Sequence, residues 1–128
     1  MSLNDFLFNT MYVRVSCNQF RIRHIEIQND LVVESPTHFT TNRLLIGQFL
    51  IAQQTLKIGM NKLMKNRRFF TPSPRVVMHP LEMVESGLSE VEERVFREVA
   101  LGAGAMKAVI WVGPALSDFE VKEKLKAR

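Results

Sequence analysis

The order in which strand-like and helix-like segments follow one another is the feature that most restricts the fold of this chain. Three β-rich runs, at residues 12–17, 20–27 and 30–35, are separated by short polar breaks, a spacing typical of an antiparallel meander. After Pro36, helical patterns alternate with two short apolar runs, at residues 75–79 and 108–112, of the kind that form buried parallel strands. The predicted order is βββαβαβα, which indicates an α/β protein with a mixed five-stranded sheet and helices on its faces.

Three helices are expected after the meander. Apolar residues recur at intervals of three, four or seven from residue 42 to about residue 65, which predicts one long helix. Ser89 and Glu92 form a capping-box pattern, because each side chain can bind a free backbone N–H at a helix start. This second helix should end at the glycines near residue 102, and a charged third helix is expected at residues 117–127.

The length of 128 residues allows one hydrophobic core and is too short for two, so we expect a single domain over residues 1–128. No apolar run approaches the roughly 20 residues of a membrane span, and the start lacks the layout of a secretion signal. A cytoplasmic location is therefore expected. The apolar start at Phe6, Leu7 and Phe8 is too short for a stable membrane anchor. Cys17 is the only cysteine, and we expect it to be a small buried side chain.

The net charge of +4 raises the question of a nucleic-acid partner. Basic residues cluster around two aromatic ones, in the series Lys62, Lys65, Arg67, Arg68, Phe69, Phe70 and Arg75. Such a cluster can follow a phosphate backbone and stack bases, but a basic helix end followed by two core-facing phenylalanines is the more common arrangement. Nucleic acid is therefore kept as an alternative partner and is not the expected one.

Several motifs occur in a fixed order beyond residue 46. They are Gly47-Gln48-Phe49-Leu50-Ile51, Ser73-Pro74-Arg75-Val76-Val77, Val91-Glu92-Glu93-Arg94 with Arg97-Glu98, Gly102-Ala103-Gly104-Ala105 with Lys107, and Pro114-Ala115. Together they resemble the corresponding stretch of the MreB proteins, the rod-shape-determining relatives of actin in bacteria. The resemblance implies the ribonuclease-H-like unit from which actins, Hsp70 proteins and sugar kinases are built.

The positions at which that family holds its nucleotide differ in this chain. The family has an Asp and a Gly-rich run in the turn between the first two strands, and a Glu-Glu-Pro before the final helix. Here the turn reads Ser16-Cys17-Asn18-Gln19, and Val112-Gly113-Pro114 precedes the last helix. A chain of this length also leaves no room for the second nucleotide-binding half. The resemblance with these departures implies a protein that is not an enzyme and holds no cofactor. The nucleotide-binding half of a split actin-like ATPase is the alternative.

No metal is expected either, because His24, His38 and His79 are widely spaced.

The expected function is a binding, adaptor or regulatory module of the bacterial cell-shape or division cytoskeleton. Its partner would be a protein, such as MreB or another cell-shape or division protein, which would also bring it to the inner membrane. An apolar surface in need of a cover favours a homo-oligomer as well. The candidate contact residues lie on the outer face of the second helix, in the apolar excess of the long helix, and on a strand edge that could pair with another chain. They are Glu90, Glu93, Arg94 and Arg97, then Leu44, Ile51 and Ile58, and finally Arg21 and Arg23.

Overall fold

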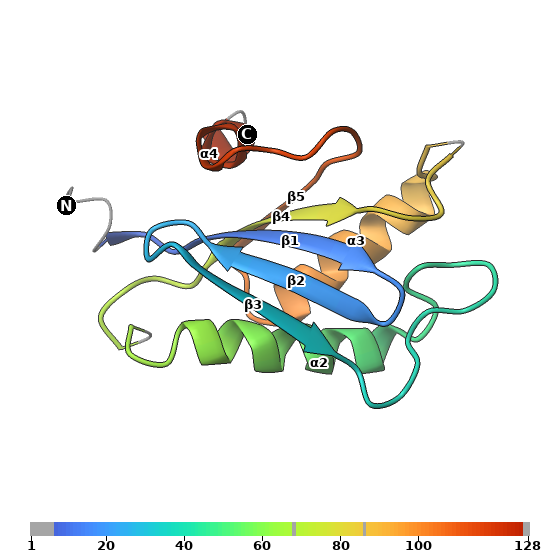
Figure 1. The fold of residues 1–128 in the computed structure, drawn as a ribbon, viewed down its shortest axis with the longest axis horizontal. Coiled ribbons are helices and arrows are strands. Elements are labelled where there is room, and N and C mark those ends of the chain that lie inside the picture. Colours follow the sequence, from blue (N-terminus) through green and yellow to red (C-terminus); the bar gives the residue numbers. More distant parts are fainter. Residues whose placement is uncertain (1–6, 68, 86, 127–128) are drawn as a thin grey trace.

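A computed structural model describes residues 7–67, 69–85 and 87–126 of the chain. Its elements are β1 (Thr10–Ser16), β2 (Gln19–His24), β3 (Asn29–Glu34), α2 (Phe49–Leu63), β4 (Arg75–Pro80), α3 (Glu90–Gly102), β5 (Lys107–Ile110) and α4 (Asp118–Lys126). They follow the predicted order of strands and helices (Figure 1). Phe6 of the apolar start and Arg68 of the basic cluster lie outside the described residues.

The five strands form one mixed sheet in the order β3-β2-β1-β4-β5. Strand β2 pairs antiparallel with both β1 and β3, whereas β4 pairs parallel with β1 and with β5. The meander is thus extended by two parallel strands, which α2 and α3 connect, and the predicted α/β class and mixed sheet are confirmed. Strand β2 lies inside the sheet, so the predicted free strand edge at Arg21 and Arg23 is wrong: both edges of their strand are already paired.

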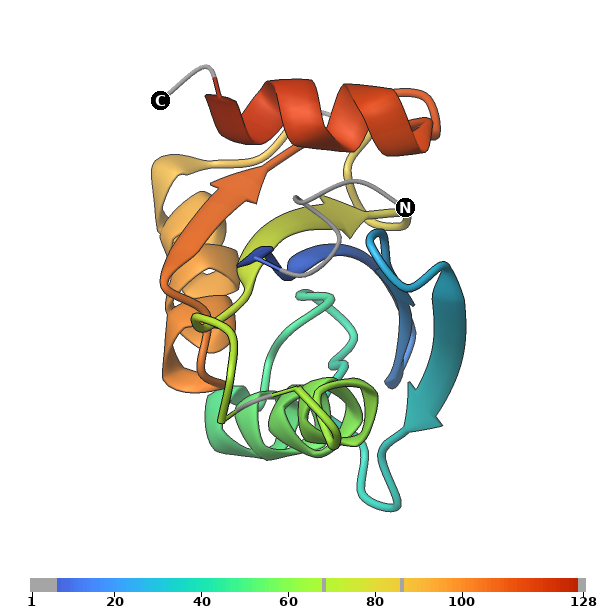
Figure 2. The same ribbon diagram turned by 90° about the vertical axis from the view of Figure 1, so that its left-hand side faces the viewer.

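Helices cover both faces of the sheet (Figure 2). Alternate residues of β1 point to opposite faces: Met11 and Val13 join the main core under α2 and α3, whereas Tyr12 joins a smaller core under α4. The central strands are therefore buried on both sides. Helix α2 packs closely on the meander, because Gly59 has no side chain at a point where a Cβ would meet Ile22 Cδ1 at 2.6 Å.

Helix α2 begins at Phe49 and not at residue 42, so the predicted start of the long helix is wrong. The preceding segment folds into turns. The Thr41 N–H donates to the Leu44 carbonyl at 2.9 Å, and the Thr41 hydroxyl accepts from the Leu44 N–H at 3.1 Å. The N–H groups of Gly47 and Gln48 both donate to the Phe39 carbonyl. These bonds use the backbone groups that a helix would need, so local turn chemistry overrides the helical pattern.

Helix α3 starts as predicted. The Ser89 hydroxyl accepts from the Glu92 N–H, and the Glu92 carboxylate accepts from the Ser89 N–H, both at 3.1 Å. A second capping box starts α4: Ser117 and Glu120 exchange the same two bonds at 2.9 and 3.2 Å. No helix in the described ranges is long and apolar enough to cross a membrane.

Candidate functional site

Two backbone N–H groups of the turn between β1 and β2 are bonded to side chains of other loops. The Cys17 N–H donates to a Glu82 carboxylate oxygen at 2.9 Å, and the Asn18 N–H donates to the Thr40 hydroxyl at 2.9 Å. The side-chain oxygen of Asn18 accepts from the N–H groups of Phe39 and Thr40, both at 2.8 Å. The Glu82 carboxylate and the Thr40 hydroxyl thus take up the N–H groups of Cys17 and Asn18.

Cys17 is exposed, so the prediction of a buried cysteine is wrong. Its Sγ lies 3.5 Å from the second oxygen of Glu82. Desolvation, followed by the hydrogen bond to Glu82, raises the pKa of the Cys17 thiol. A raised pKa keeps the thiol protonated at neutral pH, which is the opposite of what an activated nucleophile requires.

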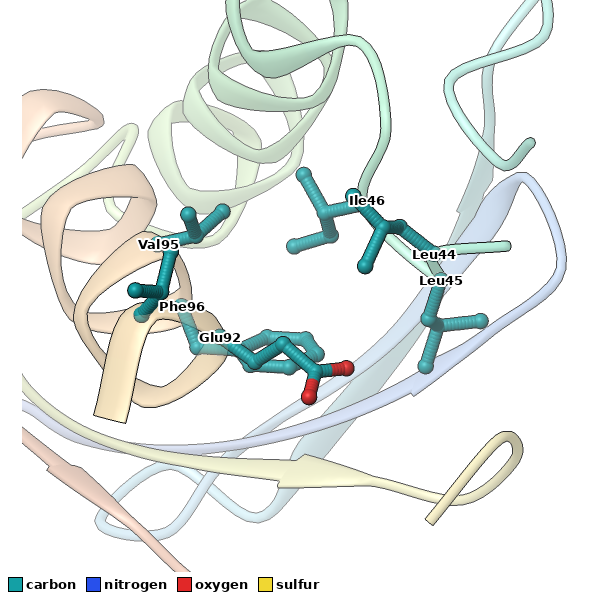
Figure 3. Close-up of a pocket in the computed structure, with 7 residues that line it drawn as sticks. Leu44, Leu45, Ile46, Glu92, Val95 and Phe96 are labelled. Carbon is teal, nitrogen blue, oxygen red and sulfur yellow. The ribbon is translucent and has the colours of Figure 1, made fainter. Parts of the chain in front are cut away.

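An apolar groove lies between the segment that precedes α2 and the first half of α3 (Figure 3). We call it the loop–α3 groove, and its volume is about 50 Å³. Figure 3 shows Val95 and Phe96 of α3 across from Ile46 and Leu44. The apolar lining residues are Leu44, Leu45, Ile46, Val91, Val95 and Phe96.

The floor and the rim of this groove differ in exposure. Leu45, Ile46 and Phe96 are buried, whereas Leu44 is 41% exposed and Val91 is 73% exposed. Single exposed aliphatic residues are ordinary on a protein surface, but here two of them, Leu44 and Val91, border one apolar hollow. The sequence analysis did not predict this groove, because the residues of its two walls are nearly fifty positions apart along the chain.

The end of the groove at α3 is acidic. Glu92 lines the groove (Figure 3). Its carboxylate also accepts the Ser89 N–H bond of the capping box. Glu90 and Glu93 stand in the same first turn of the helix. A partner that places an apolar side chain in the groove would therefore meet negative charge beside it.

The four α3 residues predicted to contact a partner do not form one open face. Glu90 and Arg94 are exposed, but Arg97 donates to the Glu93 carboxylate at 3.3 Å. Glu93 and Arg97 line a separate hollow against β5. None of these four side chains lines the loop–α3 groove, although Glu90 stands next to Val91, which does.

The three apolar residues predicted as one surface of the long helix are separated by the structure. Leu44 lies before α2, on the groove rim. Ile51 packs against the main core, and Ile58 is 53% exposed on α2. The prediction that Leu44 belongs to the long helix is therefore wrong, because the helix starts later than its pattern suggests.

The two arginines of β2 have different surroundings. Arg23 binds Asp118 of α4 with bonds of 2.9 and 3.0 Å and lies 3.3 Å from Asp30 of β3. The hydrogen bonds from Arg23 hold the pKa of the Asp118 carboxyl below its usual value. Arg23 therefore fastens α4 to the sheet, whereas Arg21 is exposed.

The predicted core position of the two phenylalanines after α2 is also wrong. Phe69 is 84% exposed and Phe70 is 87% exposed, close in sequence to Lys62 and Lys65, which are exposed as well. Arg67 faces inward instead: its Nε donates to the Asn9 side-chain oxygen at 2.8 Å.

The histidines lie apart from one another. His24 and His79 are buried, and His38 is exposed. In the part of the chain that the structure describes, no three His, Cys, Asp or Glu side chains lie close enough to hold a metal ion.

Comparison with known proteins gives one informative relative. No family model matches the chain. The chain is 35% identical over 103 residues to the uncharacterized protein YjaA of Escherichia coli strain K12, and the match covers 77% of this chain and 80% of YjaA. With that identity over most of both proteins, the chain belongs to the family of YjaA.

Proposed function

We propose that this chain is a non-catalytic protein-binding module and that the loop–α3 groove is its contact surface. The observation that carries the proposal is the exposed pair Leu44 and Val91 on the rim of an apolar hollow. Apolar side chains that fill such hollows supply most of the binding energy of an interface. Because Glu90 and Glu92 stand beside the groove, the partner segment would carry a basic residue next to its apolar one.

The internal bonds of the β1–β2 turn support the absence of nucleotide chemistry. Phosphate binding by such a turn needs free backbone N–H groups. Here Glu82 and Thr40 accept from the N–H groups of Cys17 and Asn18, and the Glu82 carboxylate would repel a phosphate. In calorimetry, saturable binding of Mg-ATP that is much tighter than the binding of inorganic phosphate would contradict this part of the proposal and would favour the nucleotide-binding half of a split ATPase.

We further propose that the sheet is the ribonuclease-H-like unit of the actin-like proteins. The strand order β3-β2-β1-β4-β5 supports this assignment, together with the antiparallel pairing of β1 to β2 and its parallel pairing to β4. On this basis the partner is MreB or another cell-shape or division protein. The chain would then act in the cytoplasm, at the inner membrane only through that partner.

The test is a pull-down of the tagged protein from its own cells, with mass spectrometry of the bound proteins. Val91→Asp places a charge on the groove rim, and Phe119→Asp places one on α4, where Phe119 is 71% exposed. We expect Val91→Asp to reduce the recovery of a specific partner by about tenfold or more, while Phe119→Asp leaves it unchanged. Equal recovery with both variants would refute the groove as the contact surface.

Light scattering on the purified chain checks the homo-oligomer. A second copy in the groove predicts an oligomer that Val91→Asp converts to a monomer and that Phe119→Asp preserves. A monomeric wild-type chain would leave a different protein as the partner.

Nucleic-acid binding is a second candidate function, favoured by the exposure of Phe69 and Phe70 beside Lys62 and Lys65. Exposed aromatic side chains can stack on bases while nearby cations neutralise phosphates. Binding of a labelled single-stranded oligonucleotide should then weaken steeply as salt is added. A double Phe69→Ser, Phe70→Ser variant should lose the binding, and an affinity that is flat with salt would exclude this candidate.

A further inference from the structure

Two arginines stand directly opposite each other on neighbouring strands of the sheet. The register pairs Arg14 of β1 with Arg21 of β2. Arg14 lies two residues after Tyr12, so both arginines belong to the face that carries α4. Directly opposed side chains have Cβ atoms about 5 Å apart, and like charges at that separation repel each other. The pair would be stabilised by an anion between the two side chains.

The acids on this face do not neutralise the pair. Asp30 and Asp118 both lie against Arg23, at 3.3 and 2.9 Å. Glu34 stands on the same face, diagonal to Arg21, but is not within 4.0 Å of either arginine. In the described ranges, neither Arg14 nor Arg21 has an ion pair within 4.0 Å. Arg23 is therefore fully paired, while its neighbours on the same face keep their positive charge.

Arg14 is held in place without a counter-charge. Its guanidinium carbon lies 5.2 Å from the centre of the Tyr12 ring, a cation–π contact. Its Nε is buried and has no hydrogen-bond partner within the described part of the chain. A buried N–H without an acceptor is rare in a stable protein, which makes this position unlike an ordinary surface arginine.

The neighbour of Arg14 on β4 is His79. An imidazole ring is neutral or positive, so it cannot supply the negative charge that would balance Arg14. Its Nε2 lies 2.8 Å from the Gly113 carbonyl and its Nδ1 lies 2.6 Å from the Tyr12 hydroxyl. The carbonyl can only accept, so Nε2 carries the proton and Nδ1 accepts from Tyr12. Burial lowers the pKa of His79, and the nearby Arg14 lowers it further. His79 is thus an uncharged side chain, held by two hydrogen bonds, that borders one side of Arg14.

We propose that Arg14 and Arg21 together bind a phosphate group, either free phosphate or the phosphate of a small ester. A phosphate dianion matches the charge of two arginines, and guanidinium groups bind its oxygens through paired hydrogen bonds. Arg14 is the fixed ligand, and the exposed Arg21 closes on the anion from the solvent side. The site lies in the carboxyl-terminal half of β1, towards the end of the sheet at which open α/β proteins bind ligands.

This site is independent of the loop–α3 groove, which lies on the other face of the sheet. The groove variant Val91→Asp should bind phosphate as the wild type does. Failure of the anion site would therefore leave the proposed protein contact untouched, and the reverse also holds.

The test is calorimetry on the full chain with inorganic phosphate, and separately with phenyl phosphate, at constant ionic strength in chloride. Arg21→Gln removes the exposed ligand, and Arg14→Lys keeps the charge of the fixed one but loses its Nε–H. The control Arg94→Gln removes an exposed charge from α3, on the opposite side of the sheet.

We expect saturable phosphate binding that Arg21→Gln and Arg14→Lys each weaken by about tenfold or more and that Arg94→Gln changes by less than about twofold. Tighter binding of phenyl phosphate would identify an ester as the ligand, whereas equal or weaker binding would identify free phosphate. Absence of saturable binding by the wild type, or equal weakening by all three variants, would overturn the proposal.

Discussion

Protonation of His24 should destabilise the folded chain as the pH falls below neutrality. The His24 side chain is fully buried on the meander. Its Nδ1 accepts from the Ile27 N–H at 3.3 Å, and its Nε2 donates to the Asn9 side-chain oxygen at 2.7 Å. Both ring nitrogens are thus occupied in the neutral form. Burial, followed by the positive charge of Arg67, lowers the pKa of His24 from 6.5 to about 4.

A nearby acid does not reverse this effect. The Glu26 carboxylate lies 3.7 Å from Nδ1 of His24, but it already accepts from the N–H and the hydroxyl of Thr10 at 2.6 and 2.7 Å. Since Nδ1 carries no proton in the neutral ring, this contact is not an ion pair at pH 7.

The size of the effect follows from the two pKa values. Between the folded value of about 4 and the unfolded value of 6.5, the unfolded chain binds more protons at this site than the folded one. The free energy of unfolding therefore falls as the pH is lowered through that window. At pH 5 the unfolded ring is almost fully protonated and the folded ring is mostly neutral, which corresponds to a loss of about 2 kcal/mol relative to pH 7.

Urea denaturation at pH 7 and pH 5 measures this loss. His24→Gln is expected to be less stable than the wild type at pH 7, because it disturbs the buried hydrogen bonds. Its stability should, however, fall by about 2 kcal/mol less between the two pH values. His79 also has a lowered pKa, but it is present in both proteins and cancels in the comparison. His38→Gln, at an exposed position, should keep the wild-type dependence. If the wild type and His24→Gln lost the same stability on acidification, the argument would be refuted.

Three further changes test the local structure, each by urea denaturation. Asn18 has a φ of 57° and accepts from the N–H groups of Phe39 and Thr40. Asn18→Ala should therefore lower the free energy of unfolding by about 2 kcal/mol. Asn18→Gly should lower it by less, because glycine tolerates that φ. Ser89→Ala removes one bond of the capping box and should cost about 1 kcal/mol, whereas Ser89→Asp should retain most of the stability. Arg23→Gln breaks partly exposed ion pairs and should cost about 1 kcal/mol or less, a loss that shrinks at high salt; a loss independent of salt would show that these pairs contribute by packing alone.

The fold was predictable to the extent that it depends on local patterns. The turn at Asn18 separates β1 from β2, as the polar break between the first two β-rich runs predicts. The Ser89 capping box was visible because its partners are three residues apart. Each of these features is decided within a few residues, where propensity and spacing are informative.

Contacts between distant segments could not be predicted in the same way. Arg23 binds Asp118, which is 95 residues further along the chain, and Glu82 reaches the Cys17 N–H across 65 residues. Neither pair has a spacing that distinguishes it from other pairs of opposite charge. The inner place of β2 is different, because the predicted meander already puts the second strand between the first and the third. The expected free edge at Arg21 and Arg23 was therefore inconsistent with the predicted strand pattern.

The segment in which the helix prediction failed is the one that makes the loop–α3 groove. Had the helix begun at residue 42, Leu44 and Ile46 would point about 200° apart around its axis, and both could not line one groove. The turn bonds of Thr41 instead hold both side chains against α3. A segment whose structure differs from the one its sequence pattern predicts is often a functional site. The turn that replaces the predicted first part of α2 thus provides one wall of the groove that we propose as the contact surface, opposite the exposed Val91.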